Sequence, residues 1–288
     1  MNNPRRDPSF WAFALFVLVA VLPIAVGLVY AAAYSFGTVG LLRQGFTFDF
    51  WTATLTRSEI WFSLLNSAYV ATLTLALTWM VALPVSLSLR RPLEQGALGT
   101  AVYLPLALPM TVAAFVVFQM FTGSGLLARP FAALGLIDSP QAFMPLIHDP
   151  ASIGVIVAFL LITIPYFSLL LRWFYRAEAV EELCRLTLTL GGTRRDCWRR
   201  VAWPILWQRG QVHTMLWWIS VFGAYEIPLL LGKQSPQMVS VLTMRKFQMF
   251  DLQQKPVAFI AALIYSVLVA AVLTLVFRRA GKQGRLGV

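Results

Sequence analysis

The sequence predicts an all-α integral membrane protein with six transmembrane helices. Its 288 residues are 59% hydrophobic and 12% charged, whereas soluble domains carry roughly 25% charged residues. The mean hydropathy is +0.72. A helix needs about 20 consecutive apolar residues to cross the hydrocarbon core of a bilayer. Segments of this kind lie at about 10–34, 61–89, 97–121, 151–172, 209–231 and 256–278. We therefore expect one transmembrane domain over residues 1–288.

The first of these segments belongs to an uncharged run from Ser9 to Leu42. The run is too long for the apolar core of a cleaved signal peptide, so we expect it to be retained as the first span. Prolines interrupt this span and the four that follow, which transmembrane helices tolerate when neighbours satisfy the freed backbone groups. A packed bundle is therefore expected. The interrupting prolines are Pro23, Pro84, Pro105, Pro109, Pro165 and Pro228.

The distribution of basic residues predicts which ends of the spans face the cytoplasm. Lysine and arginine concentrate in the cytoplasmic segments of membrane proteins. The N-terminus, residues 90–96, residues 172–209 and the C-terminus together hold 16 of the 23. Both termini are then cytoplasmic, as an even number of spans requires. This topology accounts for the net charge of +11, so no nucleic-acid partner is expected. Arginine pairs stand at three of these span ends, namely Arg5-Arg6, Arg90-Arg91 and Arg278-Arg279.

The sequence contains no recognisable catalytic, metal-binding or nucleotide-binding pattern. Its two histidines, His148 and His213, are isolated, and no pair of carboxylates stands at metal-ligand spacing. Gly232-Lys233-Gln234 lacks the hydroxyl residue and the upstream glycine of a phosphate-binding loop. We therefore expect no enzyme activity, no metal and no cofactor on this chain. Any ATP would be hydrolysed on another subunit.

The two cysteines, Cys184 and Cys197, match no zinc or redox motif. Both fall in the segment between the fourth and fifth spans, which the charge distribution places in the cytosol. Thiols stay reduced in that compartment. The sequence therefore predicts two free thiols.

That segment, residues 173–208, is the most distinctive stretch of the chain. Gly191 and Gly192 are expected to divide it into two short helices, since glycine readily adopts the left-handed turn after a helix. Thr193 is then placed to cap the second helix, with Asp196 in its first turn.

The second short helix is predicted to be amphipathic. Trp198, Val201 and Ala202 share one face at helical spacing, and Pro204 is expected to end the helix. A basic helix of this kind either lies among lipid headgroups or is held by a partner outside the membrane. The composition of the segment fits both interpretations.

Four stretches together resemble the permease subunits of binding-protein-dependent type I ABC importers, in particular those of the iron, thiamine, polyamine and phosphonate group. In the polar loop, the family's glycine, aromatic, aliphatic and proline positions match Gly191, Trp198, Val201 and Pro204. The resemblance covers residues 60–278. The other three stretches are Asn66-Ser67 in the second span, Leu104–Pro109 in the third, and FGAYEIPLLLG, Phe222–Gly232, at the end of the fifth.

The resemblance implies a permease that forms half of a translocation path in a bacterial inner membrane. It also implies ABC ATPase subunits that bind ATP and magnesium, a second permease subunit, and an extracytoplasmic solute-binding protein. The loop 173–208 would couple to the ATPase through Arg185, Gly191, Gly192, Thr193, Trp198, Val201 and Pro204.

The chain departs from the family pattern just before the glycine pair. Arg185 stands where the family has a glutamate, and Leu186-Thr187 replaces two alanines. A degenerate loop is also seen in one permease of a heterodimer. This departure therefore favours a heterodimer over a homodimer and predicts an altered contact with the ATPase.

Glu226 is the only acidic residue within the six predicted spans. Intramembrane acids usually face a cavity or a partner, so Glu226, with Tyr225 and Asn66, is a candidate for the solute path. Alternatively, its carboxylate binds backbone freed by Pro228 or lies near the outer interface. An ion-gradient-driven secondary transporter and a membrane enzyme acting on lipid-linked substrates are the alternative functions. Each of these normally needs several intramembrane ionisable groups.

Overall fold

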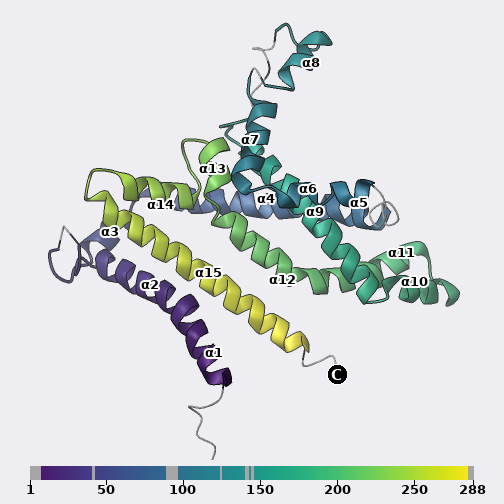
Figure 1. The fold of residues 1–288 in the computed structure, drawn as a ribbon, viewed down its shortest axis with the longest axis horizontal. Helices are drawn as coiled ribbons and strands as arrows, with labels where there is room; N and C mark the ends of the chain where they lie inside the picture. The colour runs from purple at the N-terminus through teal and green to yellow at the C-terminus, as the bar shows by residue number, and fades with distance from the viewer. Residues whose placement is uncertain are drawn as a thin grey trace, which may run out of the picture. The chain divides into compact units, whose positions relative to one another are not determined.

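The computed structural model describes residues 8–40, 43–88, 97–123, 125–139, 143 and 146–284. Over these ranges the chain forms helices joined by turns and contains no strand (Figure 1). The all-helical prediction is therefore confirmed for this part of the chain. The pairs Arg5-Arg6 and Arg90-Arg91, residue 89 of the second predicted span, and the side chain of Arg279 lie outside what the structure describes.

The chain divides into two compact units. The first unit is Met1–Phe62 with Leu242–Ala270, and the second is Ser63–Val241 with Ala271–Val288. The helices of the first unit are α1 (Pro8–Phe16), η2 (Val17–Val21), α2 (Leu22–Ser35), α3 (Asp49–Leu55), the start of α4 (Ser58–Ser88), most of α14 (Val239–Gln248) and the first part of α15 (Gln254–Gly284).

Aromatic packing and one ion pair hold the first unit together. The Phe259 ring lies 4.6 Å from the Tyr34 ring, centroid to centroid, and so joins α15 to α2. The Trp51 indole N–H donates to Ser35 Oγ at 3.2 Å. Lys246 Nζ of α14 lies 2.9 Å from a Glu59 oxygen at the start of α4.

The second unit contains most of α4 and the central helices of the chain. The remaining helices of this unit are α5 (Ala97–Ala101), α6 (Leu104–Ala107), α7 (Met110–Phe121), α8 (Ala128–Ala133), α9 (Ile153–Ala177), α10 (Val180–Thr189), α11 (Arg194–Asp196), η4 (Cys197–Ala202), α12 (Trp203–Phe222) and α13 (Glu226–Leu231).

Four helices in the described part of the chain are long and apolar enough to cross a membrane. They are Phe10–Ser35, Ser58–Ser88, Ile153–Ala177 and Gln254–Arg278, and they match the first, second, fourth and sixth predicted spans. The pair Gly99–Ala107 and Met110–Phe121, bent by 103°, gives a fifth if it forms one span. The structure thus supports a chain with several membrane-spanning helices, while the count of six stays a prediction.

The third and fifth predicted spans are both interrupted, and proline explains each break. Leu108 is extended, with ψ of 130°, because the residue before Pro109 is disfavoured in the helical region. Pro228 has no backbone N–H, and its ring clashes with the carbonyl four residues earlier. Consequently α12 ends at Phe222, and α13 starts only at Glu226.

The core of the second unit joins α4, α9 and α12. Phe167 and Leu171 of α9 and Leu206 of α12 are fully buried. Between α4 and α9, the buried hydroxyls of Thr78 and Thr163 lie 2.7 Å apart and share a hydrogen bond. Such interhelical bonds between hydroxyl side chains are typical of helices packed within membranes.

Candidate functional site

The turn after α10 depends on glycine. Gly191 has φ of +84°, in the left-handed region that glycine adopts without steric cost. Its N–H donates to Leu188 O at 3.1 Å, and the Gly192 N–H donates to Thr187 O at 2.9 Å. These bonds satisfy the carbonyls left free at the end of α10. The predicted division of the loop into two helices is therefore confirmed.

The second helix begins with the predicted cap. The Asp196 N–H donates to Thr193 Oγ1 at 3.2 Å, and the Thr193 N–H donates to Asp196 Oδ2 at 3.1 Å. The Thr193 hydroxyl also donates to Oδ2 at 2.6 Å. The hydrogen bond from the Thr193 side chain and then that from its backbone hold the pKa of Asp196 below its usual value.

Pro204 does not end this helix, contrary to the prediction. The chain passes from α11 through the π-helical turn η4 directly into α12, with Pro204 in the first turn of α12. Pro204 has no backbone N–H to donate to the preceding turn. The wider π turn before it accommodates the lost hydrogen bond. The short helix after the glycine turn is therefore continuous with α12.

The inner face of the loop belongs to the core of the second unit. Val180 and Cys184 of α10 and Ala202 of η4 are buried, and Trp198 and Val201 pack against the same cluster. The cluster continues through the ends of α4 and α9, and its other buried members there are Leu75, Trp79, Ala82, Leu83, Phe167, Leu171, Phe174 and Tyr175. The loop is therefore packed directly against these helices.

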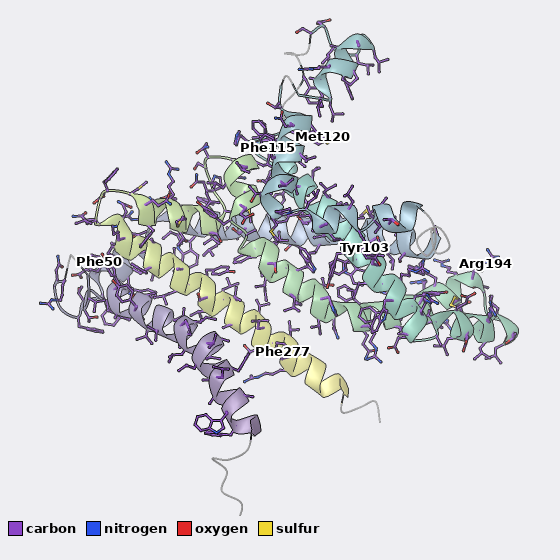
Figure 2. All side chains as sticks on the ribbon, in the orientation of Figure 1. Phe50, Tyr103, Phe115, Met120, Arg194 and Phe277 are labelled. Carbon is purple, nitrogen blue, oxygen red and sulfur yellow. A yellow bond between two sulfur atoms is a disulfide. The ribbon has the colours of Figure 1, made fainter. Side chains whose placement is uncertain are left out.

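The outer face of the loop presents leucines and arginines together. The exposed leucines of α10 and the turn are Leu183, Leu186, Leu188 and Leu190, of which Leu190 is 87% exposed. The exposed arginines that follow, with Arg194 marked in Figure 2, are Arg194, Arg195, Arg199 and Arg200. We call these eight residues the outer loop surface.

Ion pairs organise the charges around this surface. The Arg185 Nη2 atom lies 3.0 Å from Glu181 Oε1, one turn earlier in α10. Arg209 binds Glu178 through two bonds, Nε to Oε1 at 2.8 Å and Nη2 to Oε2 at 3.2 Å. The second pair ties α12 to the junction of α9 and α10. The first pair offsets the charge of Arg185, the residue at which the chain departs from the family pattern.

Cys184 and Cys197 form a disulfide, so the prediction of two free thiols is wrong for this structure. The helices α10 and η4 pack against each other and bring the two Cα atoms within 5.0 Å, inside the range that a disulfide spans. The glycine turn between two helices is the sequence signal for this proximity.

The candidate path residues occupy two separate places in the second unit. The Thr111 hydroxyl of α7 donates to Glu226 Oε2 at 2.6 Å, and Glu226 is exposed at the start of α13 beside Tyr225. Asn66 is buried, and its Nδ2 donates to Pro236 O at 3.2 Å. Ser67 Oγ accepts from the Val239 N–H at 2.8 Å. The Asn66-Ser67 pair therefore fixes the segment that follows α13.

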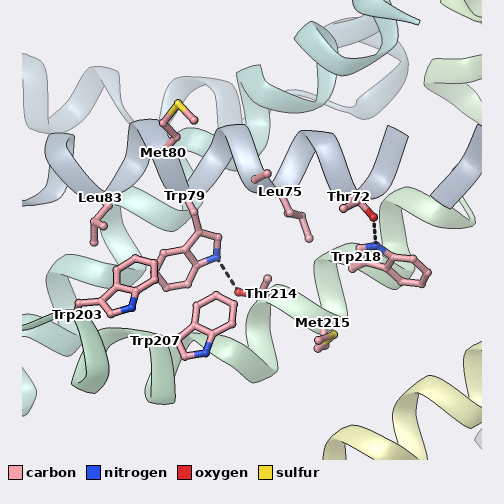
Figure 3. A pocket seen from close by; sticks show the side chains of 11 residues that line it. Thr72, Leu75, Trp79, Met80, Leu83, Trp203, Trp207, Thr214, Met215 and Trp218 are labelled. Atoms are coloured by element: carbon pink, nitrogen blue, oxygen red, sulfur yellow. Dashed lines mark hydrogen bonds between the residues drawn. The ribbon is translucent and has the colours of Figure 1, made fainter. Parts of the chain in front are cut away.

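A cavity of about 520 Å³ lies between α4 and α12 and is lined mainly by aromatic and aliphatic side chains (Figure 3). The Trp79 indole donates to Thr214 Oγ1 at 2.9 Å, and the Trp218 indole donates to Thr72 Oγ1 at 3.1 Å. The rings of Trp203 and Trp207 stack at 5.9 Å. No sequence motif indicates this cavity, because its walls come from two helices that are far apart in the chain.

No family model matches the sequence, and no curated protein matches it. A solved structure of a bacterial ABC transporter involved in the import of the acidic polysaccharide alginate matches the fold with a TM-score of 0.73, covering 96% of this chain and 96% of that chain at 15% identity. The chain has the fold of an ABC-transporter chain. A bacterial alginate ABC transporter in complex with an alginate pentasaccharide-bound periplasmic protein matches with a TM-score of 0.70, covering 94% of this chain and 93% of that one at 15% identity.

The ABC-transporter fold agrees with the broader part of the resemblance seen in the sequence. Both structures are alginate transporters, so membership of the iron, thiamine, polyamine and phosphonate group stays a prediction. Within the described residues, no group of three or more histidine, cysteine, aspartate or glutamate side chains could hold a metal ion.

Proposed function

We propose that this chain is a membrane-spanning subunit of an ATP-driven importer and that the loop 173–208 couples it to a separate ATPase. One observation carries the proposal. The inner face of the loop is built into the core of α4, α9 and α12, while its outer loop surface leaves apolar and cationic side chains uncovered. Exposed apolar side chains beside cationic ones suit a surface that binds another protein. Because the loop is packed against the membrane helices, a movement of that protein would be passed on to them.

The partners proposed are two ABC ATPase subunits, a second permease subunit and an extracytoplasmic solute-binding protein. The second alginate transporter was solved with a periplasmic protein, which supports the last of these. The chain would lie in a bacterial inner membrane with both termini in the cytoplasm. A heterodimer of permeases is favoured because Arg185 alters the loop of this chain.

Alternating access would follow when the ATPases bind ATP and draw the two coupling loops together. The movement would pass from α10 through η4 into α12, because η4 and α12 are continuous. Rocking of one bundle against the other would then open the path to alternate sides. We place Glu226 and Tyr225 beside that path, and we assign Asn66 a positioning role because its amide holds Pro236.

The proposal is tested by purifying the tagged chain from its native membrane. We expect an ABC ATPase and a solute-binding protein to copurify, and we expect ATP hydrolysis only when the ATPase is present. In proteoliposomes, uptake of the ligand carried by that binding protein should require ATP. Uptake that an uncoupler abolishes while ATP is held constant would instead indicate an ion-gradient-driven transporter.

A further inference from the structure

The disulfide Cys184–Cys197 lies at the mechanical junction of the proposed coupling loop. Cys184 is on α10, whose outer side carries the exposed leucines, and Cys197 is the first residue of η4, which continues into α12. Cys184 is 8% exposed, and Cys197 is half-buried against the same core cluster. A force applied to α10 reaches α12 through this junction.

Two kinds of link join α10 to η4 in the described part of the chain. At one end is the glycine turn, with the hydrogen bonds of Gly191 and Gly192 and the cap made by Thr193. Within the helices, packing and the disulfide provide the second point of attachment. Reduction removes the covalent part of this second attachment and leaves the packing and the turn.

A disulfide is unusual in the compartment proposed for this loop. Stable structural disulfides belong to oxidising compartments, whereas cytosolic disulfides are usually transient and redox-sensing. The proposed function, on which this inference rests, places the loop in the cytosol. A bond between these two cysteines would there be in exchange with the soluble thiol pool.

We propose that Cys184 and Cys197 form a reversible thiol–disulfide switch that sets how tightly the loop couples the ATPase to the membrane helices. The oxidised loop moves as one body and transmits the ATPase movement to α12. In the reduced loop, part of that movement is lost at the glycine turn.

Formation of the Cys184–Cys197 bond requires an oxidant, which is glutathione disulfide or another small disulfide. The thiolate of the half-buried Cys197 attacks one sulfur of glutathione disulfide, which forms a mixed disulfide and releases one glutathione. The Cys184 thiolate then attacks the Cys197 sulfur and releases the second glutathione. Two protein thiols and one glutathione disulfide thus become one protein disulfide and two glutathiones. The exposed arginines at 194, 195, 199 and 200 favour the approach of this anionic reagent.

The first test is a thiol titration of the purified full-length chain. Samples are equilibrated with mixtures of reduced and oxidised glutathione that bracket the cytosolic ratio. Their free thiols are then alkylated, and mass spectrometry measures how many thiols were modified. We expect the two thiols to appear and disappear together within this range. A pair that stays oxidised, or stays reduced, across the whole range overturns the proposal. The single variant Cys197→Ala is the control that cannot form the internal bond.

The second test measures coupling in the complex with its ATPase. The probe is the copurifying solute-binding protein with the ligand it carries, and the readout is the stimulation of ATP hydrolysis by that protein. We expect stimulation to fall several-fold when the disulfide is reduced. The double variant Cys184→Ala/Cys197→Ala should show the same stimulation as the reduced complex, and oxidant should not change it. If the double variant does not fold, the single variant Cys197→Ala replaces it in this experiment.

Different results would contradict the redox switch and the importer proposal. Equal stimulation in both redox states, or higher stimulation in the reduced state, overturns the switch and leaves the importer proposal intact. Absence of any copurifying ATPase contradicts the importer proposal and the switch with it.

Discussion

Thr193 and Asp196 show how two short side chains determine where a helix begins. Each satisfies a backbone N–H of the other at the first turn, where no helical carbonyl is available. The carboxylate is needed in its charged form for this role. The hydrogen bonds from Thr193, rather than burial, are the largest influences on the pKa of Asp196.

The first prediction concerns the pH dependence of this cap. The pKa of Asp196 is lower in the folded protein, so its contribution to stability is present above the unfolded value of about 3.9 and is lost as the pH falls through the folded value. In a carbon-13 NMR titration, Thr193→Val should raise the midpoint of the Asp196 carboxyl, and Thr193→Ser should preserve it. A midpoint that does not change in Thr193→Val contradicts the hydrogen-bond explanation.

Gly191 provides the second residue-scale prediction. Gly191→Val places a β-branched residue at φ of +84° and should cost about 1–2 kcal/mol in the free energy of unfolding. The matched control is Gly191→Asn, because asparagine tolerates the left-handed region. We expect the valine variant to insert normally but to transport less solute for each ATP hydrolysed. Equal coupling in both variants would mean that the turn has no coupling role.

Substitutions at Glu226 and at its partner Thr111 can separate the effect of the Glu226 charge on transport from the effect of the hydrogen bond between the two residues. Glu226→Gln removes the charge but keeps an oxygen that accepts from the Thr111 hydroxyl, whereas Thr111→Val removes the bond and keeps the charge. If the carboxylate meets the solute, Glu226→Gln should slow transport about tenfold or more, since hydrogen bonds to charged groups contribute roughly 1.5–3 kcal/mol. Thr111→Val should have a much smaller effect on the rate. The reverse order of effects would assign Glu226 a structural role between α7 and α13.

At the scale of elements, α12 is the helix on which the proposed mechanism depends. It is continuous with η4 at one end and interrupted before α13 at the other, so it connects the loop directly to the segment that leads to Glu226. Its packing against α4 requires a residue without a side chain. A Cβ on Gly210 would lie 2.8 Å from the Trp79 ring, which is itself packed against Phe167, Trp203 and Trp207.

This contact predicts that alanine substitutions at two glycines change the stability of the protein differently. Gly210→Ala should destabilise the chain by about 1–3 kcal/mol, since the added Cβ would push the Trp79 ring out of its packed position and strain its hydrogen bond to Thr214. The matched control is Gly27→Ala in α2, because nothing lies within 4 Å of the added Cβ there. That variant should be neutral or gain up to about 1 kcal/mol from helix propensity. Thermal unfolding in detergent measures both, and equal midpoints would disprove the packing argument.

At the scale of the whole molecule, the open question is how often the chain crosses the membrane. Among the described residues, four helices meet the requirements for a span, and the bent pair Gly99–Ala107 and Met110–Phe121 gives a fifth if it forms one span. The broken pair α12 and α13 covers the fifth predicted span. Both interruptions lie at prolines. Broken helices at membrane depth are tolerated where they are buried in protein or line a cavity.

Reporter fusions decide the number of crossings. With six spans, a periplasmic reporter such as alkaline phosphatase should be active when fused after residue 45, residue 138 or residue 240. It should be inactive after residue 94, after residue 192 and at the C-terminus, where a cytoplasmic fluorescent reporter should be active. Activity of the phosphatase at residue 192 would place the loop outside the cytoplasm and would contradict its proposed contact with an ATPase.

The sequence by itself determined the all-helical class, four of the spans, the glycine turn and the Thr193 cap. These features follow from local hydrophobicity and backbone preference, which depend on neighbouring residues only. Tertiary structure alone decided the remaining features. The tryptophan cavity arises because α4 and α12, which are distant in sequence, pack together. The disulfide depends on the packing of α10 against η4, and the continuity of η4 with α12 depends on the π turn before Pro204. Composition and periodicity within one segment carry no information about that packing. The family resemblance made the polar loop a coupling candidate, and the tertiary structure adds that its inner face lies within the core that joins α4, α9 and α12.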